Sequence, residues 1–70
     1  MQKEQLTKIK INQLKKLKEQ YFLLNPLSKE IFYVNHYSRE YKEYSISKVN
    51  DMNFEKFVKS NKTVYIGFIY

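Results

Sequence analysis

The chain has 70 residues, of which 43% are hydrophobic and 17% aromatic, and its thirteen Lys and Arg against seven Asp and Glu give a net charge of +6. This composition excludes a disordered basic tail, and the lack of cysteine excludes disulfides and thiolate metal sites. No apolar run approaches the roughly 18 residues that a membrane span needs. A chain of this length builds only a small core, so we expect a partner or self-association, and the basic charge favours acidic partners.

The first twenty residues predict an amphipathic helix over 2–20. They contain no Gly or Pro. At 100° per residue, one side of this helix collects Leu6, Ile9, Leu14, Leu17 and the following Tyr21, whereas Ile11 lies off this stripe. Lys8 and Lys15 project from the opposite side and Lys18 from its flank, so much of the positive charge lies on this element.

After Tyr21, aromatic and β-branched residues cluster between polar breaks, which predicts strands. Asn25-Pro26 is typical of a turn, so the segments on either side of it are expected to form a hairpin. Asn50-Asp51 offers a cap for a short helix, with Glu55 in its first turn and Lys59 in its last. The expected elements are strands at about 21–24, 30–35, 41–49 and 63–70 and a short helix at 53–60.

Residues 25–45 also fit a second interpretation. Asn25 and Pro26 are suitable for the N-cap and first position of a helix. The residues that would share one face of that helix are Leu27, Ile31, Val34, Tyr37, Tyr41 and Tyr44. The hairpin is preferred, because the cluster at 31–34 is aromatic and β-branched.

Together these elements predict an α+β fold in a single small domain over 1–70. The N-terminal amphipathic helix would pack on a small antiparallel sheet of three or four strands, with the short helix before the last strand. Both faces of the predicted sheet carry apolar or aromatic side chains, and one helix covers only one face. The second face is therefore predicted to be a contact surface.

The sequence offers little for catalysis. His36 is the single histidine, and it lies in a predicted turn, where a solvated side chain is the expected role. No glycine pattern for binding phosphate or dinucleotide occurs, and no spacing of side chains suggests a metal site. We therefore expect no enzyme activity, no cofactor, no metal and no small-molecule substrate.

The remaining signals are charge and seven tyrosines. Tyrosine is enriched at protein interfaces, so we expect a cytoplasmic binding protein that acts on a protein partner, including a second copy of itself. A composition rich in Lys, Asn, Ile and Tyr is typical of AT-rich coding, and it suits a phage or mobile-element inhibitor of a host factor. The alternative is an RNA- or single-stranded-DNA-binding module, in which tyrosines stack on bases and lysines contact phosphates. The candidate binding residues are Tyr33, Tyr41, Tyr65, Lys8, Lys15, Lys18, Lys42, Lys48 and Lys62.

Overall fold

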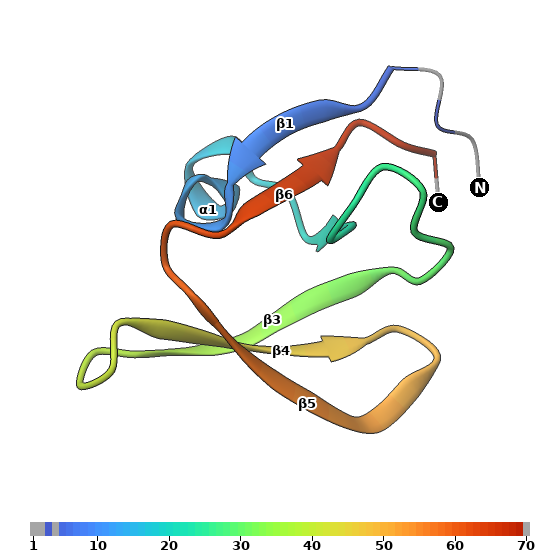
Figure 1. The fold of residues 1–70 in the computed structure, drawn as a ribbon. Helices are drawn as coiled ribbons and strands as arrows, with labels where there is room; N and C mark the ends of the chain where they lie inside the picture. Colours follow the sequence, from blue (N-terminus) through green and yellow to red (C-terminus); the bar gives the residue numbers. More distant parts are fainter. Residues whose placement is uncertain (1–2, 4, 70) are drawn as a thin grey trace.

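The computed structural model describes residue 3 and residues 5–69, and its secondary structure is dominated by β-strands (Figure 1). The elements in chain order are β1 (Thr7–Lys10), a turn of 3-10 helix (Ile11–Gln13), α1 (Leu14–Leu17), β2 (Tyr21–Phe22), β3 (Phe32–Ser38), β4 (Glu43–Lys48), β5 (Asp51–Lys59) and β6 (Thr63–Ile66). In the described part of the chain, no helix is long and apolar enough to cross a membrane.

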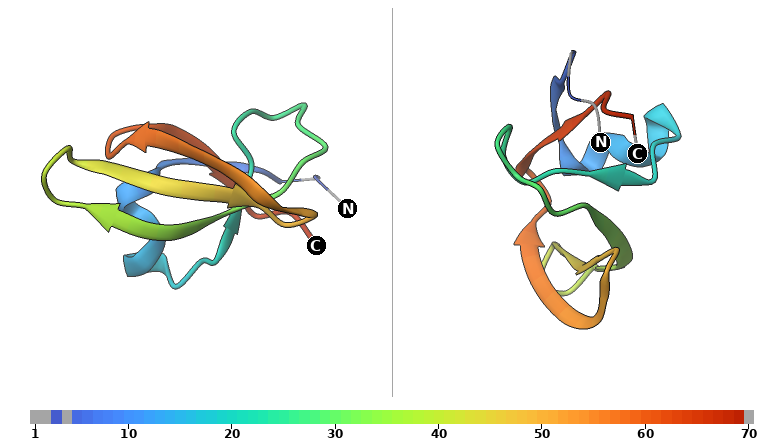
Figure 2. Two further views of the ribbon diagram at one scale, coloured as in Figure 1. Left: turned by 90° about the horizontal axis from the view of Figure 1, so that it is seen from below. Right: turned by 90° about the vertical axis from the view of Figure 1, so that its right-hand side faces the viewer.

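The strands form two antiparallel sheets. The first strand, β1, pairs with the last, β6, while β2, β3, β4 and β5 form a four-stranded sheet in that order. Figures 1 and 2 show β1, β6 and α1 in one layer and the β3–β4–β5 meander in another. Among the described residues, one isolated bridge joins the sheets, in which Leu23 and Tyr65 exchange two backbone hydrogen bonds of 2.9 Å.

The hydrophobic core draws on both sheets and on the short helical segment. Its buried members are Ile11, Leu14, Phe22, Phe32, Ile46, Val58, Val64 and Ile66. The rings of Phe22 and Phe32, which face each other across β2 and β3, lie 6.1 Å apart. Phe54 extends this cluster, with its ring 6.0 Å from that of Phe32.

The predicted helix over 2–20 is wrong for the described residues, and with it the α+β fold. Residues 8–11 (Lys-Ile-Lys-Ile) alternate polar and apolar residues, a period that also suits a strand, and pairing with β6 sets Ile9 opposite Val64. The α-helix is one turn long and ends at Lys18, which adopts a left-handed conformation with φ 58°. A short helix gains little without tertiary packing, so strand pairing prevails over the helical pattern. The prediction for residues 1–2 and 4 lies outside the described residues.

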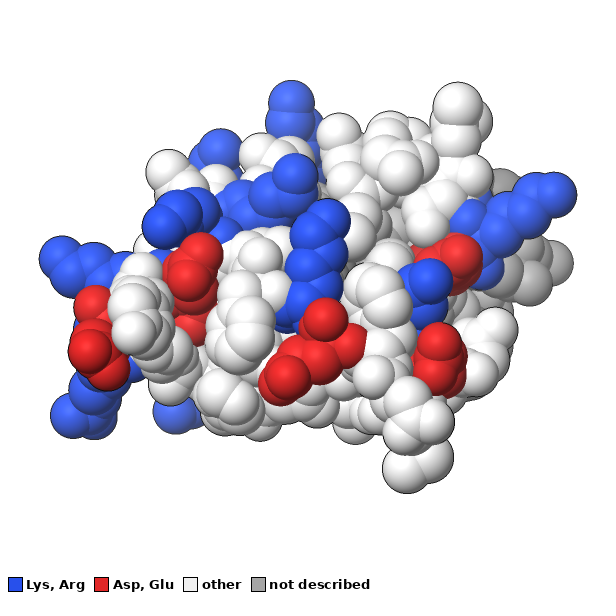
Figure 3. All heavy atoms as spheres, turned by 60° about the horizontal axis from the view of Figure 1, so that its bottom comes forward, with Lys and Arg blue, Asp and Glu red and all other residues white. Residues whose placement is uncertain are grey.

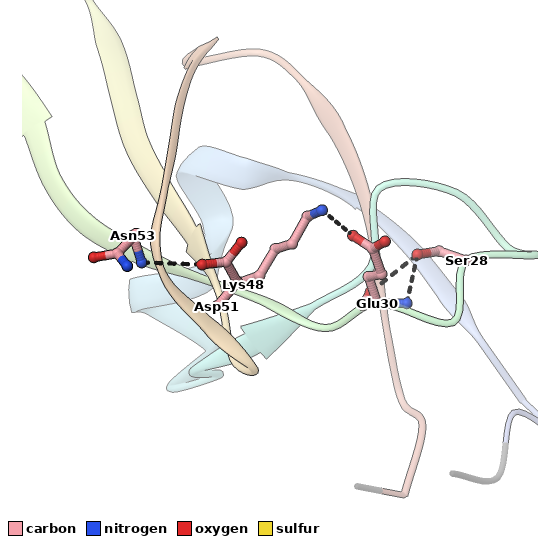
Figure 4. Close-up of polar contacts among 5 residues, drawn as sticks. All are labelled: Ser28, Glu30, Lys48, Asp51 and Asn53. Atoms are coloured by element: carbon pink, nitrogen blue, oxygen red, sulfur yellow. Dashed lines mark hydrogen bonds and ion pairs between the residues drawn. The ribbon is translucent and has the colours of Figure 1, made fainter.

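The predicted helix over 53–60 is also wrong, because this segment belongs to β5. Val49 and Asn50 form a two-residue turn, across which Lys48 pairs with Asp51. The Asp51 carboxylate accepts a hydrogen bond from the backbone N–H of Asn53 (3.2 Å, Figure 4), so its capping capacity serves a turn.

The remaining strands overlap the segments in which strands were expected. Residues 25–45 contain β3 in place of the alternative helix, and Tyr21 and Tyr33 are partners across β2 and β3. The predicted strand at 63–70 corresponds to β6, which is shorter and ends at Ile66 before the left-handed Gly67 (φ 93°). The last residue of that prediction, Tyr70, lies outside the described residues.

The loop between β2 and β3 is tied to β4 by an ion pair. The Lys48 ammonium lies 2.7 Å from the Glu30 carboxylate and 4.4 Å from the centre of the Phe54 ring (Figure 4). Within the loop, the Ser28 hydroxyl donates to the backbone carbonyl of Glu30 at 2.9 Å. Lys3 reaches the same loop and donates to the carbonyls of Pro26 and Ser28.

Candidate functional site

A groove of about 530 Å³ opens between α1 and the β3–β4 hairpin. Its apolar and aromatic lining consists of Ile11, Leu14, Val34, Tyr37 and Tyr44. Ile11 and Leu14 belong to the helical segment, and the other three residues belong to the two strands. The groove therefore exists because one helical turn packs against the hairpin without covering it.

A β-bulge in β3 determines which side chains reach the groove. Val34 and Tyr37 are three residues apart and would point to opposite faces of a regular strand. The pairing register shifts between Val34 and His36, which inserts an extra residue into β3. The shift brings Val34 and Tyr37 to the same side of the sheet.

Two tyrosines form one wall of the groove. Tyr37 and Tyr44 are partners across β3 and β4, and their ring centres lie 4.7 Å apart at an angle of 50°. Tyr37 is 42% exposed, so part of its ring is open to an incoming group. Burial, and secondarily the neighbouring Tyr37 hydroxyl, raise the pKa of Tyr44.

The rim of the groove is polar and carries more positive than negative charge. It consists of Lys15, Lys18, Glu19 and Gln20, all of them exposed. The left-handed Lys18 ends α1 and turns the chain back toward β2, which places the rim residues along one side of the groove. An apolar lining beneath two ammonium groups suits a ligand that combines an apolar side chain with carboxylates.

A second, smaller cavity of about 410 Å³ lies on the other face of the meander. It is lined by His36, Ser38, Tyr41, Glu43 and Phe57. Ser38 follows Tyr37 directly in β3, so the two side chains point to opposite faces. The Glu43 carboxylate lies 3.4 Å from the Lys59 ammonium, which balances its charge.

A polar network crosses three strands beside this second cavity. The buried Ser45 hydroxyl donates to the Glu55 carboxylate at 2.6 Å. The Asn35 amide donates to the hydroxyls of Ser45 (3.3 Å) and Ser47 (2.7 Å). Sequence reasoning missed this network, although two serines flanking Ile46 in a strand were a readable sign of small, hydrogen-bonded positions.

The candidate residues from the sequence fall in several places. Lys15 and Lys18 line the groove, and Tyr41 lines the second cavity. Lys42 follows Tyr41 in the β3–β4 turn, with φ 54°. Lys8 lies opposite Tyr65 in the two-stranded sheet.

The other three candidates are in structural positions. The half-buried Tyr33 lies between Tyr21 on β2 and Ser47 on β4. Lys48 is engaged with Glu30 and Phe54, and the carbonyl of Lys62 accepts a hydrogen bond from the backbone of Ile11. The structure thus brings together Lys15 with Lys18 and Lys8 with Tyr65, and does not gather the nine residues into one surface.

Charge on the meander side of the molecule is mixed. Figure 3 shows acidic groups lying among the basic ones there, with uncharged side chains between them. This face therefore lacks the uninterrupted positive track that a phosphate backbone favours. Among the described residues, no group of three or more His, Asp or Glu side chains is placed to hold a metal ion.

No significant match to the chain was found among protein-family models, curated proteins or solved structures.

Proposed function

We propose that this chain is a small, non-enzymatic protein-binding module. An apolar side chain from an acidic segment of the partner would enter the groove between α1 and the β3–β4 hairpin. The observation that supports this proposal is a groove in which the exposed ring of Tyr37, the half-buried Val34 and Tyr44, and the exposed Lys15 and Lys18 line one opening. We expect the chain to bind its partner in the cytoplasm. Action on a host factor is a prediction from the composition.

The expected binding free energy is that of one apolar side chain buried in the groove. Burial of one Leu or Phe side chain contributes about 1.5–3 kcal/mol, and an exposed ion pair with Lys15 or Lys18 adds roughly 0.2–1 kcal/mol. An isolated peptide would therefore bind with a Kd on the order of 1 mM or weaker. A folded partner would bind more tightly through contacts around the groove.

The nucleic-acid alternative has less support. Base stacking needs exposed aromatic rings in a row, and of its proposed tyrosines Tyr33 and Tyr65 are half-buried while Tyr41 lies at a hairpin tip. Lys48, one of the lysines proposed for phosphate contacts, is held by Glu30. This alternative becomes an outcome of the test below.

The test is an NMR titration of the 15N-labelled protein. The probes are short acidic peptides with one central leucine, phenylalanine or tryptophan, and a single-stranded oligonucleotide serves as the competing ligand. We expect the peptides to shift the amide resonances of Leu14, Lys15, Tyr37 and Tyr44 in a saturable manner. Shifts that require the oligonucleotide and centre on Lys8 and Tyr65 would contradict the proposal.

Variants make the test specific. Tyr37→Ala should weaken peptide binding several-fold, because it removes the exposed half of the aromatic wall. Tyr41→Ala is the matched control, since Tyr41 is 64% exposed but lies outside the groove. Equal effects of the two substitutions would place the binding surface elsewhere.

A further inference from the structure

The outer edge of β5 (Asp51–Lys59) is open. β5 is the last strand of the four-stranded sheet, and β4 is its only partner among the described residues. Figures 1 and 2 show no other strand along its outer side. Such an edge presents unpaired backbone N–H and C=O groups that accept another strand.

The hydrogen bonds between β4 and β5 show which residues of β5 direct their backbone N–H and C=O groups to the open edge. The N–H of Ser60 donates to the carbonyl of Lys42 at 3.2 Å, so this pair is bonded across β4 and β5. In an antiparallel ladder, bonded and non-bonded positions alternate. Val58 is therefore bonded toward β4, whereas Phe57 and Lys59 direct their N–H and C=O groups to the open edge.

We propose that a second copy of this chain pairs with the β5 edge, antiparallel and with Phe57 opposite Phe57 of the second copy. A two-fold axis through this pair is the symmetry that a homodimer of antiparallel edge strands requires. The two edges would exchange backbone hydrogen bonds at Phe57 and at the outward-facing positions on either side. The two four-stranded sheets would then become one of eight strands.

Charge complementarity selects this register. If the two-fold axis passes through Glu55, Lys56 or Lys59, that residue faces its own copy, so that like charges meet. If the axis passes through Val58, no positively charged side chain faces a negatively charged one. Centring on Phe57 places Glu55 opposite Lys59 of the second copy, and Lys59 opposite Glu55 of the second copy. The edge is thus self-complementary in this one register of the five.

The side chains involved are already held on one face. Glu55 accepts a hydrogen bond from Ser45, and Lys59 lies 3.4 Å from Glu43. Phe57 lies on that face as well, with its ring 6.4 Å from His36, and it is 50% exposed. In the dimer, each Phe57 ring would cover its counterpart and bury apolar surface that the single chain leaves in water.

A register shift in the β4–β5 pairing between Ile46 and Lys48 distorts the first half of β5. The regular edge is therefore the segment from Glu55 to Lys59. Pairing over so short a segment predicts a reversible dimer that depends on protein concentration.

The test is sedimentation equilibrium of the full chain from micromolar to millimolar concentration. We expect the weight-average mass to rise toward twice the monomer mass. Glu55→Lys and Lys59→Glu should each abolish the rise, because each creates two like-charge oppositions. An equimolar mixture of the two variants should restore it, since their edges are complementary to each other. Lys56→Glu, on the other face of the strand, is the control that should dimerise like the wild type.

Wild-type protein that stays monomeric at millimolar concentration would overturn the proposal. A dimer that persists in both single variants would also overturn it, because the contact would then use another surface. Circular dichroism verifies that the variants fold, and the double variant Glu55→Lys/Lys59→Glu, which keeps the edge self-complementary, should dimerise. The inference is independent of the groove, so Tyr37→Ala should leave the mass unchanged.

Discussion

His36 on β3 and Phe57 on β5 approach each other edge-on, with 6.4 Å between their ring centres. Ser45 lies opposite both residues in the strand between them. Its small side chain leaves room for the two rings above it, and its hydroxyl is fully buried. This cross-strand row joins the second cavity to the open edge of the sheet.

Ser45→Ala should destabilise the fold. The substitution removes the 2.6 Å hydrogen bond to the Glu55 carboxylate, and hydrogen bonds to charged groups contribute about 1.5–3 kcal/mol. Because Glu55 is exposed and regains water, we expect a loss of about 1.5 kcal/mol in urea unfolding. Ser47→Ala, which removes a bond to the neutral Asn35 amide, should cost about 1 kcal/mol or less. A larger loss for Ser47→Ala would contradict this ranking.

Gly67→Ala should be more damaging than its exposed position indicates. Gly67 has φ 93°, and an added Cβ would lie 2.6 Å from the backbone carbonyl oxygen of Gln5. We expect a loss of about 1–3 kcal/mol, measured by urea or thermal unfolding. Ile69→Ala, two residues further on at a 63% exposed position, is the control and should cost much less. Similar losses for both would show that the close approach is relieved at little cost.

The raised pKa of Tyr44 predicts a loss of stability in alkali. Its ordinary value is 10.0, and burial followed by Tyr37 raises it in the folded chain. The folded state therefore holds this proton more tightly than the unfolded state. The corresponding stability is fully present below about pH 10 and is lost as the pH rises through the folded pKa.

The measurement is the urea midpoint of wild type and Tyr44→Phe from neutral pH to about pH 11. The wild type should lose stability more steeply above about pH 10, while other titrating groups cancel in the comparison. Parallel curves for the two proteins would contradict the predicted shift.

Lys48→Met should loosen the loop between β2 and β3. It keeps the aliphatic stem but removes the ammonium that lies near Glu30 and over Phe54. Because Glu30 is about half exposed, we expect a loss of only about 0.5–1 kcal/mol, reduced by high salt. Hydrogen exchange of the loop amides would report it. Lys29→Met, at the neighbouring loop position, should have a smaller effect.

Strands could be predicted where the local residues strongly favour them, whereas both predicted helices were wrong. Phe32–Val34 and Thr63–Ile66 are aromatic and β-branched, and both lie in strands. The apolar residues among the first twenty fit one face of a helix, but residues 7–10 also fit a strand. Pairing with β6, which is distant in sequence, stabilises the strand. Asn50-Asp51 fits a helix cap, but Asn50 also suits the hairpin turn in which it lies and Asp51 begins the strand, so β5 was assigned to the wrong class.

The groove could be anticipated only in part. Lys15 and Lys18 were candidates because of their charge, and they lie at its rim. Tyr37 and Tyr44 were not among the candidate binding residues, because a bulge near Val34 sets the face on which Tyr37 lies. A bulge changes the alternation by one residue and leaves no sign in the pattern of apolar positions. Whether these residues bind a partner stays a prediction.

The pairing of β1 with β6 has a consequence for biosynthesis. Lys10 is the partner of Thr63, so this sheet joins segments that are far apart in sequence. While the ribosome still holds β6, the nascent chain presents Ile9 and its neighbours without their final strand. Such long-range closure slows folding, and we expect the meander β3–β5 to form first and the two-stranded sheet to close last.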